Sequence, residues 1–349
     1  MRPVATQLGL LAGLILLLVA SISAAEAPAA AARDPAARLS SAPAASEYWN
    51  LTASFAGGYR LFARFGITNE GPGERTAGAL WYLVHPNGRV SEFRNGRSKS
   101  RWTLSPDRLY IDVASSTLDL HGPVRRLELD TTSQGARIDL RFPAADIMLS
   151  TAPPTGRLRS DTLQTSAPIE GTIWERGMVA PVVVHGTTTL THVWMDDSLP
   201  DVLQRHIEFI GAAQDLTVYL SDFTTPSGES GRSLLLQRGG ATVFQSTDVE
   251  LLIDPSDRKD REGNYPLPGR LLAHAGSVAL EVRTQRPLHR TNPLAAVPQP
   301  FRFLFSLKID PRFIWADATF RLTLDAADGA RDAEGLGILA LIFVNPPKP

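Results

Sequence analysis

Short runs of alternating apolar and polar residues dominate this sequence from Tyr48 onward, and turn residues separate them. In residues 59–67, for example, every second side chain from Tyr59 to Ile67 is apolar. A period of two places these side chains on one face of a β-strand. Many short strands at regular spacing predict an all-β protein built as a sandwich or as barrels. We expect two antiparallel β-barrels in tandem, because closing a sheet removes its exposed edges.

Turn and helix signals refine this pattern. The dipeptide Asn87-Gly88 between two strand-like runs predicts a hairpin, because both residues accept positive φ. Only residues 199–210 have helical spacing, with Pro200 in the first turn. The other strands are expected at residues 79–85, 89–93, 109–113, 125–129, 136–142, 182–197, 215–223, 233–238, 241–245, 249–254, 277–283, 301–309, 318–324 and 337–344.

Residues 148–166 break the strand rhythm with consecutive prolines and Gly156. A proline cannot donate to a strand ladder, so such a stretch favours a connection over a strand. We therefore place the boundary between the two halves there. The expected N-terminal barrel covers residues 47–160, and the expected C-terminal barrel covers residues 168–346.

The N-terminus has the pattern of a secretory signal peptide. Arg2 is followed by an apolar run at residues 8–20 and then by small residues. The apolar run is shorter than the roughly 20 residues of a membrane span, although an uncleaved anchor is the alternative. We expect residues 1–27 to be a signal peptide and residues 28–46 to be a disordered Ala/Pro-rich linker. The protein would then be exported, to the periplasm or the extracellular space.

Composition excludes several classes of function. Lys plus Arg number 35 and Asp plus Glu 36, so no basic surplus points to nucleic acid. The chain has no cysteine, hence no thiolate nucleophile and no disulfide. It contains no H-E-x-x-H pair, no P-loop, no G-x-G-x-x-G and no G-x-S-x-G. We expect neither a metal nor a cofactor.

Four residues on two predicted strands are the candidate ligand-binding residues. His192 and Trp194 are two positions apart and share a face, as do Tyr219 and Ser221. If both pairs face the inside of the second barrel, all four line one apolar cavity. The ring of Trp194 could then steady a cationic centre beside His192. The alternative is a core histidine that is simply hydrogen-bonded and packed.

Two aspartates are candidate acids. Asp196 shares the face of His192 unless a bulge intervenes, and Asp222 lies on the face opposite Ser221 unless a bulge turns it back. A carboxylic acid in an apolar pocket has a raised pKa and can deliver a proton. For Asp196, the alternative is a turn former or the cap of the following helix.

These motifs resemble a family of two-domain lipocalin-like proteins. It includes carotenoid 1,2-hydratase (hydroxyneurosporene synthase), the AttH-type bacterial proteins and fungal survival-factor relatives. The resemblance spans residues 47–346 and implies two tandem lipocalin-like barrels. It rests on Tyr48-Trp49, residues 59–68, the turn at Pro86-Asn87-Gly88, Thr191-His192-Val193-Trp194 and Gly263-Asn264-Tyr265-Pro266.

The resemblance also implies a chemistry. Hydratases of this family use a His-x-Trp strand and a Tyr-x-Asp strand whose aspartate protonates a terminal isoprenoid double bond. His192, Trp194 and Tyr219 match, but Ser221 stands at the position of that aspartate. A serine hydroxyl is far too weak an acid for this step at neutral pH. The departure favours binding over catalysis.

Three functions follow as hypotheses. The first is an exported protein that binds a hydrophobic small molecule, an isoprenoid, a carotenoid or another lipid, in a barrel cavity. The alternative is a cofactor-independent hydro-lyase that adds water to an isoprenoid alkene or cyclises it, with Asp222 or Asp196 as acid and Trp194 and Tyr219 stabilising the cation. The third is a protein with filled barrels that acts through its surface, as the partner of a membrane-associated transport complex.

Overall fold

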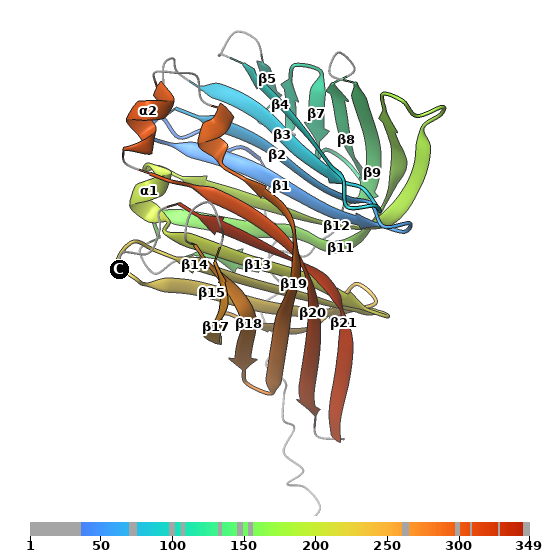
Figure 1. Cartoon of the computed structure of the whole chain (residues 1–349), viewed down its shortest axis with the longest axis vertical. Coiled ribbons are helices and arrows are strands. Elements are labelled where there is room, and N and C mark those ends of the chain that lie inside the picture. Colours follow the sequence, from blue (N-terminus) through green and yellow to red (C-terminus); the bar gives the residue numbers. More distant parts are fainter. Residues whose placement is uncertain are drawn as a thin grey trace, which may run out of the picture. The chain divides into compact units, whose positions relative to one another are not determined.

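Two curled antiparallel sheets make up almost all of the regular structure in the computed structural model (Figure 1). Both belong to one compact unit, residues 32–349. The expected signal peptide, residues 28–35 of the expected linker and the Gly263-Asn264 dipeptide lie outside the described residues. The described residues are 36–69, 75–97, 102–105, 109–131, 135–144, 149–152, 156–259, 265–296, 301–307, 309–326 and 329–344.

The first sheet has 12 strands in the order β4-β3-β2-β1-β12-β11-β9-β8-β7-β6-β5, with β10 paired to β11 beside this path. Its strands are β1 (Ser46–Phe55), β2 (Arg60–Thr68), β3 (Thr76–Val84), β4 (Val90–Arg97), β5 (Trp102–Ser105), β6 (Tyr110–Val113), β7 (Ser116–Asp119), β8 (Val124–Thr131), β9 (Ala136–Pro143), β10 (Leu149–Thr151), β11 (Leu158–Glu175) and β12 (Val182–Met195).

The second sheet has 9 strands in the order β16-β15-β14-β13-β21-β20-β19-β18-β17. Its strands are β13 (Arg205–Ala213), β14 (Leu216–Thr224), β15 (Ser230–Arg238), β16 (Ala241–Ser246), β17 (Glu250–Lys259), β18 (Pro266–Ala275), β19 (Val278–Thr291), β20 (Arg312–Ala326) and β21 (Gly329–Phe343). The helices of the described part are α1 (Leu199–Val202), α2 (Phe301–Ser306) and the 3₁₀ turn η3 (Pro293–Ala296). No helix among the described residues is long and apolar enough to cross a membrane.

The structure confirms the all-β class and the two tandem lipocalin-like sheets. It also confirms the hairpin at Asn87-Gly88, where β3 turns into β4 and Gly88 takes a φ of 84°. The place where the chain changes sheets differs from the expectation. Strand β12, expected in the second half, pairs with β1 of the first sheet. Residues 148–166, expected as a connection, contain β10 and the start of β11, and β11 pairs with β9 and β12. The chain passes to the second sheet only between β12 and β13.

Two expected elements are wrong for physical reasons. The helix expected at 199–210 stops at Val202, and its second half is strand β13. Residues 206–209 read His-Ile-Glu-Phe, and this alternation of polar and apolar side chains fits a strand, with all four side chains buried. The strand expected at 301–309 contains α2 instead. Aromatic residues favour strands only where a pleated surface packs against a partner strand, and α2 pairs with no strand of the described chain.

Each sheet curls around its own apolar core. The first core contains the large rings Trp49, Phe65, Trp81 and Phe142. The second is filled by aliphatic side chains and aromatic rings, among them Phe209 and Phe320. Protein interiors pack to near crystal density, so among the described residues these side chains fill the centre of each sheet. This packing directs the search for a ligand site to the ends of the sheets and to the region between them.

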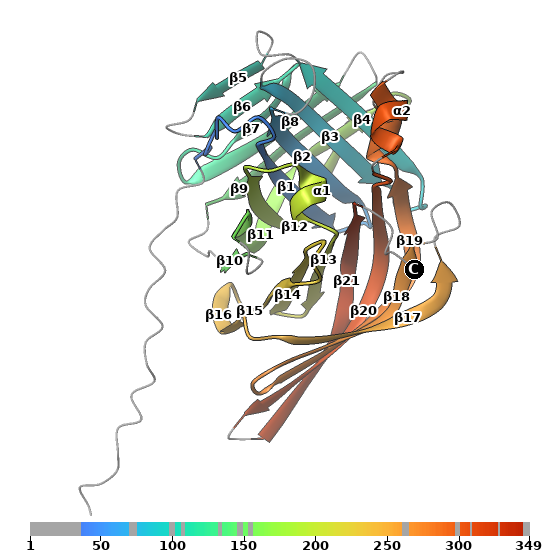
Figure 2. The same cartoon turned by 90° about the vertical axis from the view of Figure 1, so that its left-hand side faces the viewer.

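A third layer of contacts joins the two sheets. The rings of Phe62 and Trp315 lie 4.4 Å apart across it. Hydrogen bonds connect Thr151 of β10 to Ser233 of β15 (2.7 Å), and Thr165 of β11 to Gln237 of β15. Figure 2 shows β10 to β12 beside β13 to β15 at this layer. Strands of the two sheets that meet here are therefore buried on both faces.

Candidate functional site

The four residues expected to line one cavity divide between two places. His192 and Trp194 on β12 face the interior of the first sheet, where the His192 ring stacks on Trp49 at 4.6 Å. Tyr219 and Ser221 on β14 face away from the core of the second sheet; Tyr219 packs with Leu149 of the first sheet. The expected shared cavity inside the second barrel does not form, because β12 belongs to the other sheet.

A cavity of about 820 Å³ lies at the end of the first sheet where β1 begins and β12 ends, and we call it the mouth pocket. This volume is within the range of small-molecule sites. Its lining mixes apolar and charged side chains. They include Leu39, Ile67, Trp194, Met195, Glu47 and Asp161.

Part of the expected linker belongs to this pocket. Residues 36–45 are packed against the first sheet, with Ala37 and Leu39 against its core. The backbone N–H groups of Arg38 and Leu39 donate to the two carboxylate oxygens of Glu47, at 2.7 and 2.9 Å. The Arg38 guanidinium lies 5.4 Å from the centre of the Trp194 ring. For these residues the expectation of disorder is wrong, because a buried carboxylate fixes the backbone.

A buried Glu–His pair lies beneath this segment. His192 Nε2 donates to Glu47 Oε1 at 2.7 Å, and neither side chain is more than 6% exposed. The other ring nitrogen, Nδ1, is buried and has no hydrogen-bond partner in the described part of the chain. On β11, Asp161 lies directly opposite His192 and is itself buried. Two carboxyl groups therefore flank one imidazole at the floor of the mouth pocket.

Sequence reasoning missed both carboxyl groups. Glu47 lies opposite Trp194 in the pairing of β1 with β12, and only that long-range register reveals the relationship. One local signal was available. Glu47 has the same parity as Trp49, Leu51 and Ala53, so an acid stands on an otherwise apolar face.

The two candidate acids lie in very different surroundings. Asp196 is exposed at the rim of the mouth pocket. Asp222 is fully buried, with Arg232 Nε 2.9 Å from one carboxylate oxygen and an Arg205 nitrogen 3.0 Å from the other. No bulge interrupts β14, so Asp222 stays on the face opposite Ser221. Because two guanidinium groups occupy its oxygens, this geometry does not favour Asp222 as a proton donor.

Tyr219 and Ser221 instead belong to a polar cluster between the sheets. The Tyr219 hydroxyl donates to Glu208 Oε1 on β13 at 3.0 Å. Ser221 Oγ is hydrogen-bonded to His206 Nε2 at 3.1 Å. From β2, Arg64 stacks over the Tyr48 ring at 4.3 Å, and one of its terminal nitrogens is buried without a partner. We call Tyr48, Arg64, His206, Glu208, Tyr219 and Ser221 the intersheet cluster.

Burial shifts the ionisation of this cluster. It raises the pKa of Glu208 to about 7, against the opposing effects of the Tyr219 hydrogen bond and the Arg64 charge. It lowers the pKa of His206 to about 3, and Arg64 lowers that pKa further. Near neutral pH the cluster thus holds a carboxyl group that keeps its proton part of the time beside a neutral imidazole. A carboxyl of this kind is suited to general acid catalysis.

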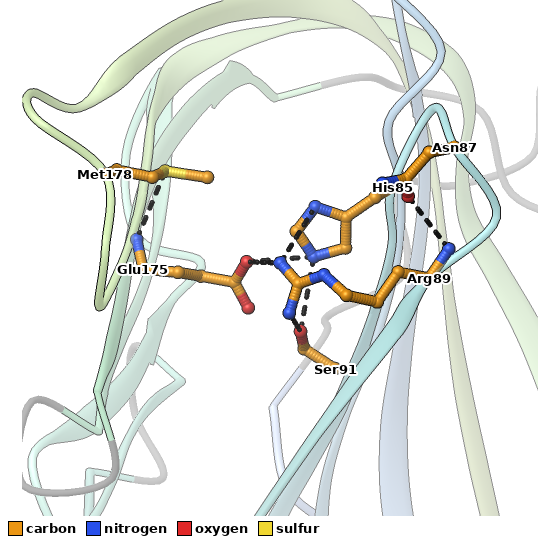
Figure 3. A network of polar contacts seen from close by, with 6 residues as sticks. All are labelled: His85, Asn87, Arg89, Ser91, Glu175 and Met178. Carbon is orange, nitrogen blue, oxygen red and sulfur yellow. Dashed lines mark hydrogen bonds and ion pairs between the residues drawn. The ribbon is translucent and has the colours of Figure 1, made fainter.

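A third polar network lies at the turn between β3 and β4 (Figure 3). Its members include a serine, a histidine and a glutamate, the residue types of a nucleophilic triad. Yet Ser91 Oγ and Glu175 Oε2 both approach His85 Nε2, at 3.2 and 2.8 Å. A triad needs the carboxylate and the hydroxyl on opposite ring nitrogens. With Arg89 also 2.7 Å from Glu175, the network is a clamp between this turn and the end of β11.

The described residues contain no group of three or more His, Cys, Asp or Glu side chains arranged to hold a metal ion.

The two curled antiparallel sheets, each wrapped around its own core, define a tandem lipocalin-like protein. Within that class the chain has the fold of the AttH-like proteins, and the resemblance inferred from the sequence is confirmed at the level of fold. No protein-family model matches the sequence, and no curated protein matches it. The likeness is therefore visible in three dimensions and not in sequence identity.

Three solved structures illustrate it. A candidate AttH from Nitrosomonas europaea matches with a TM-score of 0.62 and 12% identity, over 84% of this chain and 91% of that one. CghA in complex with Sch210972 matches with a TM-score of 0.59 and 11% identity, over 88% and 90%. Kievitone hydratase from Nectria haematococca matches with a TM-score of 0.56 and 9% identity, over 86% and 90%.

Proposed function

We propose that this protein binds an apolar small molecule, an isoprenoid or another lipid, in the mouth pocket. The observation that carries the proposal is the 820 Å³ cavity at the end of a lipocalin-like sheet. Apolar side chains, with Trp194 among them, form part of its wall, while buried polar groups form its floor. Ligand sites commonly combine an apolar wall with a few placed polar groups. If the N-terminal signal is cleaved, this binding would take place outside the cytoplasm.

The test begins with the purified protein as it is. Extraction with organic solvent and mass spectrometry should reveal a co-purifying lipid, and calorimetric titration with farnesol should give a saturable site. Replacing Trp194 by Ala should weaken binding about tenfold, because the apolar contact area lost with the ring is worth about 1.5 kcal/mol. The matched control is Leu336→Ala, which removes a 67% exposed side chain of β21 that lies outside the mouth pocket. Absence of any bound or titratable apolar ligand would refute the proposal.

A second candidate function is the hydration of an alkene, and Glu208 favours it. A carboxyl with a pKa of about 7 could give its proton to one carbon of a double bond, leaving a carbocation on the other. The aromatic ring of Tyr219 could stabilise that cation, whereas Arg64 already covers a face of the Tyr48 ring. Water would then add to the cation and return one proton to the Glu208 carboxylate. One solved neighbour is a hydratase by name, which agrees with this class of reaction.

Incubation with an acyclic carotenoid in ¹⁸O-labelled water tests the second candidate. Hydration would add one labelled water to the product. Glu208→Gln should abolish turnover, and the rate should follow an apparent pKa near 7. Asp196→Asn and the control Glu170→Gln, at an exposed glutamate of β11, should leave the rate unchanged. Turnover by Glu208→Gln at the wild-type rate would exclude Glu208 as the acid.

A further inference from the structure

Two arginines of the mouth pocket have no partner for their guanidinium groups among the described residues. These are Arg75 and Arg159, which both line the pocket. Within the described part of the chain, no side chain forms an ion pair or a hydrogen bond with either guanidinium. Most other arginines of the two sheets are paired, as Arg126 is with Asp139 at 2.7 Å. Two unpaired guanidinium groups at the rim of one cavity are a binding feature for an anion.

Arg75 is held in place at a cost. Its backbone has a φ of 52°, in the left-handed region that non-glycine residues seldom adopt. Its carbonyl accepts a 2.8 Å hydrogen bond from the indole N–H of Trp102, which fixes that conformation. A non-glycine residue in this region is strained, and such residues tend to be kept at ligand sites. Arg75 is therefore positioned at the start of β3, and its half-buried side chain is directed to the pocket.

Arg159 lines the same pocket from β11, where it is exposed. It lies directly opposite Trp194 in the pairing of β11 with β12, and Glu47 lies opposite Trp194 on the other flank. The side chains of Arg159, Trp194 and Glu47 therefore lie side by side on three neighbouring strands. An apolar chain on Trp194 would bring a terminal anionic group within reach of Arg159.

The acidic residues of the pocket differ in whether their carboxyl groups are already engaged by other groups. Glu47 is engaged by two backbone N–H groups and by His192. Asp161 is buried and accepts from the Ser150 hydroxyl. Asp196 is the exception, since it is exposed at the rim and unpaired within the described residues. It opposes an anion, and its removal provides a test.

We propose that the mouth pocket selects an amphiphile, with an apolar chain against Trp194 and a carboxylate or phosphate head between Arg75 and Arg159. This inference rests on the proposed binding function and adds the chemical class of the ligand. The apolar chain supplies burial, and the head supplies charge-assisted hydrogen bonds. Neutral lipids with a chain of the same length would contact the same apolar side chains but would lack the charge-assisted hydrogen bonds to the arginines.

Calorimetry with four probes tests it, each amphiphile kept below its micelle concentration: laurate, methyl laurate, dodecyl phosphate and inorganic phosphate. Laurate and dodecyl phosphate should bind at least about tenfold more tightly than methyl laurate, and inorganic phosphate should bind only weakly. Arg159→Gln and Arg75→Gln should each remove most of the advantage of laurate and leave methyl laurate unaffected. Asp196→Asn should tighten laurate. The control Arg321→Gln, at a 59% exposed arginine of β20, should change nothing.

The outcomes distinguish a failure of the anionic head from a failure of the proposed binding function. If methyl laurate binds as tightly as laurate, the anionic head is refuted and the binding function stands. If inorganic phosphate binds as tightly as dodecyl phosphate, the site takes a free anion and the amphiphile is refuted. If no probe with an apolar chain binds, the proposed function itself fails. Because Arg75 has an unusual backbone conformation, Arg159→Gln at an exposed position decides the matter if Arg75→Gln does not fold.

Discussion

Glu208 lies directly opposite Ser221 in the pairing of β13 with β14, on the same face of the second sheet. The resemblance to hydratases implies an aspartate at position 221, and its absence favoured binding over catalysis. The structure supplies the carboxyl group of Glu208 instead, on the neighbouring strand β13. This carboxyl accepts a hydrogen bond from the Tyr219 hydroxyl, which would also lie near an aspartate at position 221. An acid beside Tyr219 is thus available from β13, and this is the observation that supports a hydratase as the second candidate.

Glu208→Gln should make the protein less sensitive to alkaline pH. The unfolded carboxyl ionises near pH 4.5 and the native one near 7. Between these values only the native state keeps the proton, so stability falls as the pH rises from 4.5 through 7, by about 3 kcal/mol in total. Urea unfolding at pH 5 and pH 9 measures the difference. An equal loss in the variant and the wild type would contradict the raised pKa.

His206→Gln should protect the protein at acid pH. The native imidazole has a pKa of about 3 and the unfolded one a pKa of 6.5. The unfolded state therefore binds a proton that the native state refuses, and stability falls as the pH drops from 6.5 towards 3, by up to about 5 kcal/mol. Thermal unfolding between pH 4 and pH 7 should show a shallower slope for the variant. The matched control His121→Gln, at an exposed histidine, should retain the wild-type slope.

Glu47→Leu should release the segment at residues 36–45. The substitution removes the acceptor for Arg38 N–H and Leu39 N–H and leaves His192 buried without a partner. A loss of about 2–4 kcal/mol is expected, because an unsatisfied buried group keeps its full desolvation cost. Hydrogen exchange should show rapid exchange at Arg38 and Leu39. The control Glu170→Leu, at an exposed glutamate of β11, should leave both amides protected.

Gly337→Ala should destabilise the second sheet. A Cβ at this position would lie 2.5 Å from the Ile210 carbonyl oxygen and 2.5 Å from the Phe209 ring. The backbone would have to shift, at a cost of about 1–3 kcal/mol. Gly96→Ala is the comparison, because no atom of the described residues lies within 4 Å of its added Cβ. Chemical denaturation measures the free energy of unfolding of both variants. An equal value for the two would contradict the expected clash of the added Cβ with the Phe209 ring.

The sequence predicted what depends on local periodicity. The period-two runs located most strands, and Asn87-Gly88 located a turn. It could not assign β12 to a sheet, because Trp49 and His192 meet only through a pairing between distant segments. Nor could it tell which face of β14 is interior, since Val218 and Tyr219 are both fully buried. The candidate ligand-binding residues therefore lie on strands, as expected, but those strands belong to different sheets and share no cavity inside the second one.

The pairing of β1 with β12 has a consequence for the order in which the chain acquires its structure. Asn50 and its partner Thr191 are 141 residues apart, so one flank of β1 has no neighbour until synthesis passes β12. At roughly 5–20 residues per second, this interval is on the order of ten seconds on the ribosome. Throughout it, the nascent β1 presents an open ladder edge that could recruit another chain. Slow maturation and dependence on a holding chaperone are the expected costs of joining the first strand to the twelfth.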